Sequence, residues 1–430
     1  MVSRFIYAIL FVFVLFAPAQ AVDVNIVEAN GVRAWVIKDN ILPIVSVEIA
    51  FKNAGSGHDP EGKEGVGYQV SSMLNEGAGE YDSQEYQRLL EENAIQFVPR
   101  LDKDNFYISL KTLTENLSLA VDLTSVAMSK PIFTADDYER IKGQTLTVLK
   151  KENESQSEVA GKAFEKIMFG THPYSRHKEG DEATLEKITP EDLHQYVHAK
   201  FARDNIIISI VGDVDDEVAK EIVANLTKDL PEKSQTTELP VFDSYPKASI
   251  NQIHMNNPQT YVIFGEKGIK RDDKDYYAAY ILNHIFGGSG FSARLMTEVR
   301  EKNGLAYSIG TALQPMDKAE LFAGVVSTKS QDVEQSIKII QTEFKRMAEK
   351  GINAQELKTA KDYITGSYGL NLDKNENLAA FMVSLQIFGL PPEYLNKRND
   401  YFKSVTLEQI NAVAKRLIRP ESLVFIKVGP

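Results

Sequence analysis

The stretch Glu64–Tyr81, EGVGYQVSSMLNEGAGEY, has the pattern of a helix that presents one reactive face. Tyr68, Ser71 and Ser72 follow the i, i+3, i+4 spacing that places three side chains on the same side of a helix. All three carry hydroxyl groups, which stay protonated at neutral pH and are poor ligands for a metal ion. The segment therefore has the shape of a catalytic helix without residues that can hold a metal or move a proton.

A second stretch, Gly287–Gly310, carries a cation and a phenol seven residues apart, in GGSGFSARLMTEVREKNGLAYSIG. Its pattern predicts a helix over 292–302 and a strand over 305–309, with a glycine as the helix stop. The helix is preceded by a tight turn that contains Gly287, Gly288 and Gly290.

Arg300 and Tyr307 are the two side chains of this stretch that could act on a substrate. Arg300 falls in the last helical turn, where a cation complements the helix dipole. Tyr307 falls on the following strand, where a half-buried aromatic residue is common. Taken by themselves, these positions are explained by a solvated arginine and a strand tyrosine.

A metal site would have to be built from His, Asp or Glu, because the chain contains no cysteine. His194 and His198 lie one helical turn apart and could bind a metal together, with Glu152 as a carboxylate from elsewhere. Tyr196 and Val197 mark the apolar side of that helix, which favours a solvated face for both histidines. A displaced metal site from Glu152 and these histidines has no geometric support in the sequence.

The elements that would position these residues occur twice. Residues 188–214 and 405–430 each read as a capped helix followed by an apolar strand, and they align without a gap. Residues 101–112 and 316–328 are a second, shorter pair of similar segments. The chain is therefore predicted to be a tandem duplication of one α/β unit.

A polar segment bracketed by prolines, 231–246, joins the two repeats and has the composition of a linker. Segments 24–37 and 45–53 read as a hairpin-like pair. Strands and helices otherwise alternate irregularly, which favours an α+β fold, with a mixed β-sheet and helices packed on one face in each domain. The expected divisions are a signal peptide 1–21, an N-terminal domain 22–235, a linker 236–244 and a C-terminal domain 245–430.

Composition narrows the classes of function. With 430 residues, 43% of them apolar and 25% charged, the chain is a globular protein of about two domains. Its net charge of −12 argues against nucleic acid and against an anionic membrane surface as partners. Basic or unfolded peptides are compatible with it.

The N-terminus reads as a secretory signal, with Arg4, an apolar run Phe5–Phe16 and a small-residue end at Ala21. The apolar run is too short to span a bilayer comfortably. We therefore expect cleavage after Ala21 and an exported protein, periplasmic or secreted, without stable membrane insertion. A retained signal anchor is the alternative.

The tandem α+β units and the E-G-x-G-x₅-M-L-x-x-G helix resemble the inverzincin metallopeptidases, the pitrilysin and mitochondrial processing peptidase family, whose zinc helix carries H-x-x-E-H. The resemblance covers essentially the whole chain after residue 21. In that motif Tyr68 stands for the first histidine, Ser71 for the glutamate and Ser72 for the second histidine. The family's third zinc ligand is a glutamate on a later helix, and the aligned residues 147–149 hold no carboxylate. The resemblance implies that this chain binds no metal.

Arg300 and Tyr307 match an Arg/Tyr pair that the same family carries in its second half. In the family, the tyrosine hydroxyl donates to the carbonyl oxygen under attack and the arginine helps to orient the peptide. A donor of this type lowers the barrier by about 3 kcal/mol. The resemblance also implies that Gly287, Gly288 and Gly290 let the backbone turn tightly beside the substrate.

A missing zinc motif and a retained Arg/Tyr pair together predict a division of labour between two chains. This chain is expected to be inactive alone and to pair with a homologous H-x-x-E-H subunit that brings the zinc. The pair would hydrolyse peptides or unfolded segments. The alternative is a non-catalytic scaffold or peptide-binding pseudo-peptidase, which would have no need of Arg300 and Tyr307.

Overall fold

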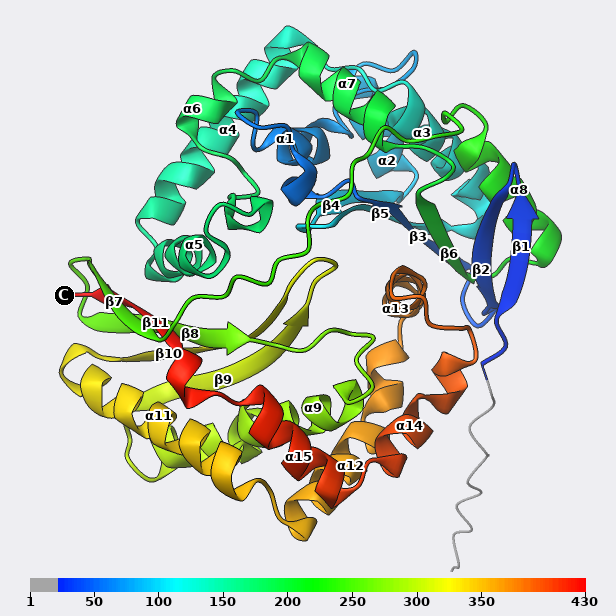
Figure 1. The fold of residues 1–430 in the computed structure, drawn as a ribbon. Coiled ribbons are helices and arrows are strands. Elements are labelled where there is room, and N and C mark those ends of the chain that lie inside the picture. The colour runs from blue at the N-terminus through cyan, green and yellow to red at the C-terminus, as the bar shows by residue number, and fades with distance from the viewer. Residues whose placement is uncertain (1–21) are drawn as a thin grey trace, which may run out of the picture.

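The structure is a computed structural model that describes residues 22–430 (Figure 1). The predicted signal over 1–21 lies outside these residues. In the described part of the chain, no helix has the length and apolar character needed to cross a membrane. The chain forms two halves, each a sheet with helices, whose sheets face one another (Figure 1).

The first half is built on a six-stranded mixed sheet in the order β1-β2-β6-β3-β5-β4. Its strands are β1 Asn25–Ala29, β2 Val32–Lys38, β3 Ile44–Lys52, β4 Gln96–Leu101, β5 Asn105–Leu113 and β6 Ile206–Gly212. Its helices are α1 Val66–Met73, α2 Ser83–Glu92, α3 Leu117–Ser129, α4 Ala135–Asn153, α5 Gln156–Phe169, α6 Glu182–Leu185, α7 Pro190–Lys200 and α8 Asp216–Thr227. Most of these helices share one apolar core with a single face of the sheet.

The second half is built on a five-stranded mixed sheet in the order β7-β11-β8-β10-β9. Its strands are β7 Ser249–His254, β8 Gln259–Lys267, β9 Ala306–Pro315, β10 Glu320–Lys329 and β11 Val424–Gly429. Its helices are α9 Tyr276–Asn283, α10 Arg294–Met296, α11 Val333–Lys350, α12 Ala354–Gly366, α13 Asn375–Ile387, α14 Tyr394–Ser404 and α15 Leu407–Leu417. A second core joins most of these helices to one face of this sheet.

The two sheets repeat one topology, and the predicted α+β class with two tandem homologous domains is confirmed. The order β2-β6-β3-β5-β4 corresponds to β7-β11-β8-β10-β9, and the equivalent pairs β2–β6 and β7–β11 are both parallel. The predicted hairpin-like pairing of 24–37 with 45–53 is wrong, because β6 lies between β2 and β3. The hairpin is β1–β2, whose turn residues Asn30 and Gly31 both have positive φ, as tight hairpin turns require.

Each half also lends one helix to the sheet of the other half. Helix α5 packs on β8 and β11, and helix α13 packs on β6 and β3 (Figure 1). The apolar side chains that α5 contributes to this second-sheet cluster include Ala160, Phe164 and Met168. Those that α13 contributes to the first sheet include Met382 and Leu385. Each sheet is therefore covered by its own helices on one face and by a helix of the other half on the opposite face.

Candidate functional site

Helix α1 is fixed at its start by a buried carboxylate. Gly65 has φ +100°, and the backbone N–H groups of Gly65 and Gly67 donate to the Asp59 carboxylate at 2.8 and 3.2 Å. Burial raises the pKa of Asp59 to about 7. Further along, the Gln69 side-chain amide donates to Thr145 Oγ1 of α4 at 3.0 Å. These contacts hold α1 in a defined orientation against its neighbours.

The three hydroxyl residues of α1 lie half-buried on one side of the helix. Ser71 Oγ donates to the backbone carbonyl of Tyr68 at 2.8 Å, and Ser72 Oγ donates to the same carbonyl at 3.0 Å. Burial raises the pKa of the Tyr68 phenol above its usual value, so this group is neutral at physiological pH. The helix thus offers no anionic oxygen and no free imidazole to a zinc ion.

Residues 147–149 of α4, which align with the family's third zinc ligand, also include no carboxylate. Thr147 Oγ1 donates to the carbonyl of Gly143 at 2.9 Å, and Leu149 is buried in the core of the first half. Val148 is exposed. The nearest carboxylate along the helix is Glu152, one turn further on.

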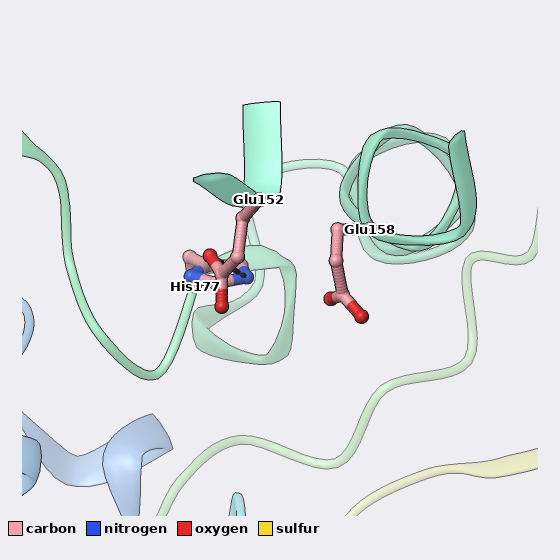
Figure 2. A group of neighbouring side chains, drawn as sticks. All are labelled: Glu152, Glu158 and His177. Carbon is pink, nitrogen blue, oxygen red and sulfur yellow. Dashed lines mark ion pairs between the residues drawn. The ribbon is translucent and has the colours of Figure 1, made fainter. Parts of the chain in front are cut away.

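Glu152 lies beside residues that the sequence pattern does not predict as its neighbours. Its Oε2 atom lies 3.1 Å from Lys162 Nζ and 3.9 Å from His177 Nε2. Glu152, Glu158 and His177 can each offer one ligand atom, and these three atoms lie within 4.8 Å of one another (Figure 2). No local pattern marks His177 as a partner of Glu152, because the two residues meet only through the fold.

The displaced metal site considered from sequence, with Glu152 beside His194 and His198, does not form. Both histidines are exposed on α7, whose buried side holds Leu193 and Tyr196. The His194 ring lies against Phe133, with ring centroids 4.9 Å apart. The prediction of a solvated histidine face is confirmed.

The glycines of the second half form a turn that packs against β9. Gly287 and Gly288 end a widened helical turn over His284–Gly288. A Cβ atom on Gly287 would lie 2.3 Å from Thr311 Oγ1, so only glycine fits there. Gly290 has φ +62° and open space around it. The first glycine is thus required by packing and the last by backbone conformation.

The helix predicted over 292–302 is shorter and less regular than expected. It consists of α10 and a widened turn, Thr297–Glu301, in which the N–H of Lys302 donates to the carbonyl of Thr297 at 3.0 Å. Leu295 and Val299 are fully buried, as the pattern predicted. Widened turns of this kind are often found at functional sites.

Arg300 and Tyr307 lie together on the surface of the second half. The Arg300 guanidinium carbon is 5.1 Å from the centre of the Tyr307 ring and 4.6 Å from the centre of the Phe291 ring. A cation between two aromatic rings is held by attraction to their faces. Tyr307 is 81% exposed and Phe291 is 64% exposed. The strand pattern alone is consistent with a half-buried Tyr307, whereas in the structure its side chain is largely exposed.

Within residues 22–430, no hydrogen bond or ion pair joins α1 to the Arg300–Tyr307 segment. Besides the packing of α5 and α13, the halves also meet at the turns that precede β5 and β10. The N–H of Asp317 donates to Asp104 at 3.0 Å, and the N–H of Lys318 donates to the Tyr174 hydroxyl at 3.1 Å. The Tyr174 hydroxyl in turn donates to Asp104, and burial raises the pKa of Asp104 to about 6.

A cavity of about 570 Å³ opens beside this contact, between the two sheets. Its polar lining includes the ion pair of Arg100 with Glu48, at 2.6 Å, and Arg271 from the second half. Its apolar lining includes Ile387 and Phe388 at the end of α13. The cavity is of the size that holds a small ligand or a few residues of an extended peptide.

Two tandem α+β halves that repeat one sheet topology thus face one another around this cavity. The family model described as insulinase, peptidase family M16, matches residues 36–182, and the model described as peptidase M16 inactive domain matches residues 187–364. The chain belongs to the M16 peptidase family, which confirms the resemblance drawn from the sequence.

The relatives to which this chain is similar include one described as a non-peptidase and one described as a zinc protease. A crystal structure described as a peptidase M16 inactive domain from Pseudomonas fluorescens is 29% identical, with a TM-score of 0.90 over 95% of this chain and 98% of that one. "Non-peptidase homolog YmxG" of Helicobacter pylori is 25% identical over 96% of both chains. "Uncharacterized zinc protease YmxG" of Bacillus subtilis is 22% identical over 90% of this chain and 94% of its own.

Proposed function

We propose that this chain is the subunit without the catalytic zinc in an exported two-chain zinc peptidase. The partner is a homologous H-x-x-E-H subunit that carries the zinc, and this chain contributes Arg300 and Tyr307. The observation that supports this most is the exposure of the pair. Tyr307 is 81% exposed, and its hydroxyl makes no hydrogen bond to another described residue. A polar aromatic residue held in place by a stacked arginine, yet open to solvent, is suited to act on something that another chain brings.

In this role the two side chains act on the scissile peptide. The Tyr307 hydroxyl donates a hydrogen bond to the carbonyl oxygen as it gains negative charge. The Arg300 guanidinium, with its five N–H donors, orients the peptide backbone. Gly287, Gly288 and Gly290 form the turn beside them and leave room for that backbone. The substrate is a peptide or an unfolded segment, and neither nucleic acid nor a membrane is a partner.

The zinc enters with the partner, because Tyr68, Ser71 and Ser72 give α1 no ligand for it. We also propose that residues 1–21 direct the chain out of the cytoplasm, to the periplasm or the medium. Detection of the mature chain in the exported fraction, beginning at residue 22, is the expected result. A chain confined to the cytoplasm would contradict this part of the proposal.

The test is to purify the chain from its exported fraction with whatever binds it and to measure peptide hydrolysis by the complex. Tyr307→Phe removes one hydroxyl and is expected to lower kcat about 100-fold with little change in KM. Tyr401→Phe is the matched control, since Tyr401 is a partly exposed tyrosine of the same half, on α14. Equal activity of the Tyr307→Phe and wild-type complexes would contradict the proposed role.

The second candidate is a non-catalytic scaffold or peptide-binding protein. The similarity over 96% of both chains to a Helicobacter pylori protein named a non-peptidase homolog favours it. In that case the purified chain binds its partner or peptide equally well with Tyr307→Phe and Arg300→Ala, and no hydrolysis depends on either residue.

A further inference from the structure

We infer that Glu152, Glu158 and His177 form a site for one divalent transition-metal ion of the zinc class. The site lies close to α1 but uses none of its residues. It does not depend on a partner chain and goes beyond the proposed function. The proposed site departs from the expectation, drawn from the family resemblance, that this chain binds no metal.

The three ligands come from three different elements. Glu152 is at the end of α4, Glu158 is in the first turn of α5, and His177 follows the short turn Pro173–Ser175. Figure 2 shows the Glu152 carboxylate in front of the His177 ring, with Glu158 to one side of them, beside α5. Zinc bonds of about 2.0–2.1 Å place neighbouring ligand atoms about 3.3 Å apart. The distance of 3.9 Å from Glu152 Oε2 to His177 Nε2 is therefore closed by a small side-chain rotation.

A buried carboxylate behind His177 sets the direction of its ring. His177 Nδ1 lies 2.9 Å from Glu179 Oε2, and the Glu179 side chain is only 4% exposed. Since Nδ1 faces Glu179, Nε2 is the ring nitrogen on the side of Glu152 and is the ligand atom. The two atoms Nδ1 and Glu179 Oε2 are not aligned for a hydrogen bond, and a small rotation of the ring would give His177 the carboxylate support that metal-binding histidines commonly have.

The Glu152 carboxylate is ion-paired but lacks a directed hydrogen bond. Its Oε2 atom is buried and makes no aligned hydrogen bond, although it lies 3.1 Å from Lys162 Nζ and 3.9 Å from His177 Nε2. Buried polar atoms in native structures are rarely left without a directed partner. A metal ion between Glu152, Glu158 and His177 would bind this oxygen directly and would displace the Lys162 ammonium toward solvent.

One imidazole and two carboxylates suit zinc, manganese or iron(II), and the absence of a thiolate disfavours copper(I). The ion would tie the end of α4 to the start of α5, the corner from which α5 crosses to the second sheet. Its consequence is a firmer attachment of the first half to the second. With three protein ligands, an open position is left for water.

The experiment is calorimetric titration of the purified full-length mature chain, without partner, with Zn²⁺ alone. We expect one ion per chain. His177→Gln is expected to weaken binding more than about 100-fold, since loss of a mere supporting group already costs 10–100-fold. Glu158→Gln removes an exposed ligand with little risk to folding and is expected to weaken binding at least about tenfold. His198→Gln and Glu154→Gln change exposed residues outside the group and serve as controls.

Lys162→Gln separates a metal site from an ordinary ion-pair network. It removes the cation that competes for Glu152 and is expected to tighten Zn²⁺ binding, whereas loss of a ligand weakens it. Absorption of the Co²⁺-loaded chain reports imidazole ligation, and His177→Gln is expected to change that spectrum. No binding by the wild-type chain, or binding that survives both His177→Gln and Glu158→Gln, would overturn the inference.

Discussion

In the first half of the molecule, the hydroxyl groups of Ser71 and Ser72 donate to a carbonyl of their own helix, whereas in the second half the phenol of Tyr307 projects from an edge strand into solvent. The two halves share one sheet topology, so the difference does not come from the fold. Polar groups satisfied inside a helix have little left to offer a ligand. An exposed Tyr307 stacked on Arg300 has its hydroxyl available. The equivalent halves thus differ at these two places: the hydroxyls of α1 are used inside the helix, and the phenol of Tyr307 is left open to solvent.

The comparison treats the two halves as parts of one cooperatively folded unit. Helices α5 and α13, which each half packs on the sheet of the other, test this most strongly. Phe164 of α5 is buried against Gly265 of β8. Phe164→Ala is expected to cost about 4 kcal/mol of the free energy of unfolding. Met382→Ala on α13 is the counterpart, with an expected cost of about 3 kcal/mol. Urea denaturation followed by far-UV circular dichroism measures both.

A single transition that shifts in each variant is the expected result. Val148→Ala, at an exposed position of α4, is the control and should change the free energy of unfolding by less than about 0.5 kcal/mol. If Phe164→Ala moved only one of two separate transitions, the halves would be independent. The reciprocal packing of α5 and α13 would then contribute little.

The glycine turn of the second half gives the next largest effect. Gly287→Ala would place a Cβ atom 2.3 Å from Thr311 Oγ1 and is expected to cost about 3 kcal/mol. Gly290→Ala meets no atom within 4 Å and suffers only from its positive φ, so about 1 kcal/mol is expected. Thermal unfolding measures the two in parallel. Equal costs would mean that packing against β9 does not hold the turn in place.

The sequence was sufficient for the parts of the fold that local signals define. Thr189 and Thr406 both begin helices with capping boxes, and the strands that follow them, β6 and β11, are equivalent. Asn30-Gly31 is a local hairpin signal, and the turn of the β1–β2 hairpin lies there. The insertion of β6 between β2 and β3 has no local signal, because it pairs residues far apart in the chain.

Only part of the candidate site could likewise be predicted from the sequence. Arg300 and Tyr307 could be paired from a motif and lie together in the structure. The exposure of Tyr307 was not foreseen, since a strand alternation alone does not tell which face of an edge strand is covered. His177 could not be joined to Glu152, because their approach depends on how the turn Pro173–Ser175 folds back toward α4.

The contact between the halves is expected to weaken as pH rises. Burial raises the pKa of Asp104 to about 6, above its value in an unfolded chain, so the folded protein binds this proton more tightly. The resulting stability is full below about pH 4 and is lost as pH rises through about 6. Because Asp104 is only partly buried, a loss of up to about 2 kcal/mol is expected.

The measurement is the free energy of unfolding between pH 4 and pH 7 for the wild-type chain and for Asp104→Asn. The variant keeps one of the two acceptor oxygens that Tyr174 and Asp317 use, but it cannot titrate, so its pH dependence should be smaller by that amount. Asp59 and Glu266, whose pKa values burial raises to about 7, titrate in both proteins and cancel in the difference. Identical pH profiles would show that Asp104 has an ordinary pKa.

The smallest effect is expected at the hydroxyl face of α1, and it tests the structural half of the comparison. Ser72→Ala removes a bond to a carbonyl that is already part of the helix and substitutes a better helix former. A change of less than about 0.5 kcal/mol is expected, with no change in the activity of the complex. Gln69→Ala on the same helix is the control, since it breaks a buried hydrogen bond to Thr145 and should cost about 2 kcal/mol. A large loss of activity with Ser72→Ala at unchanged stability would mean that α1 takes part in the chemistry, and the two halves would no longer differ in the way their side chains suggest.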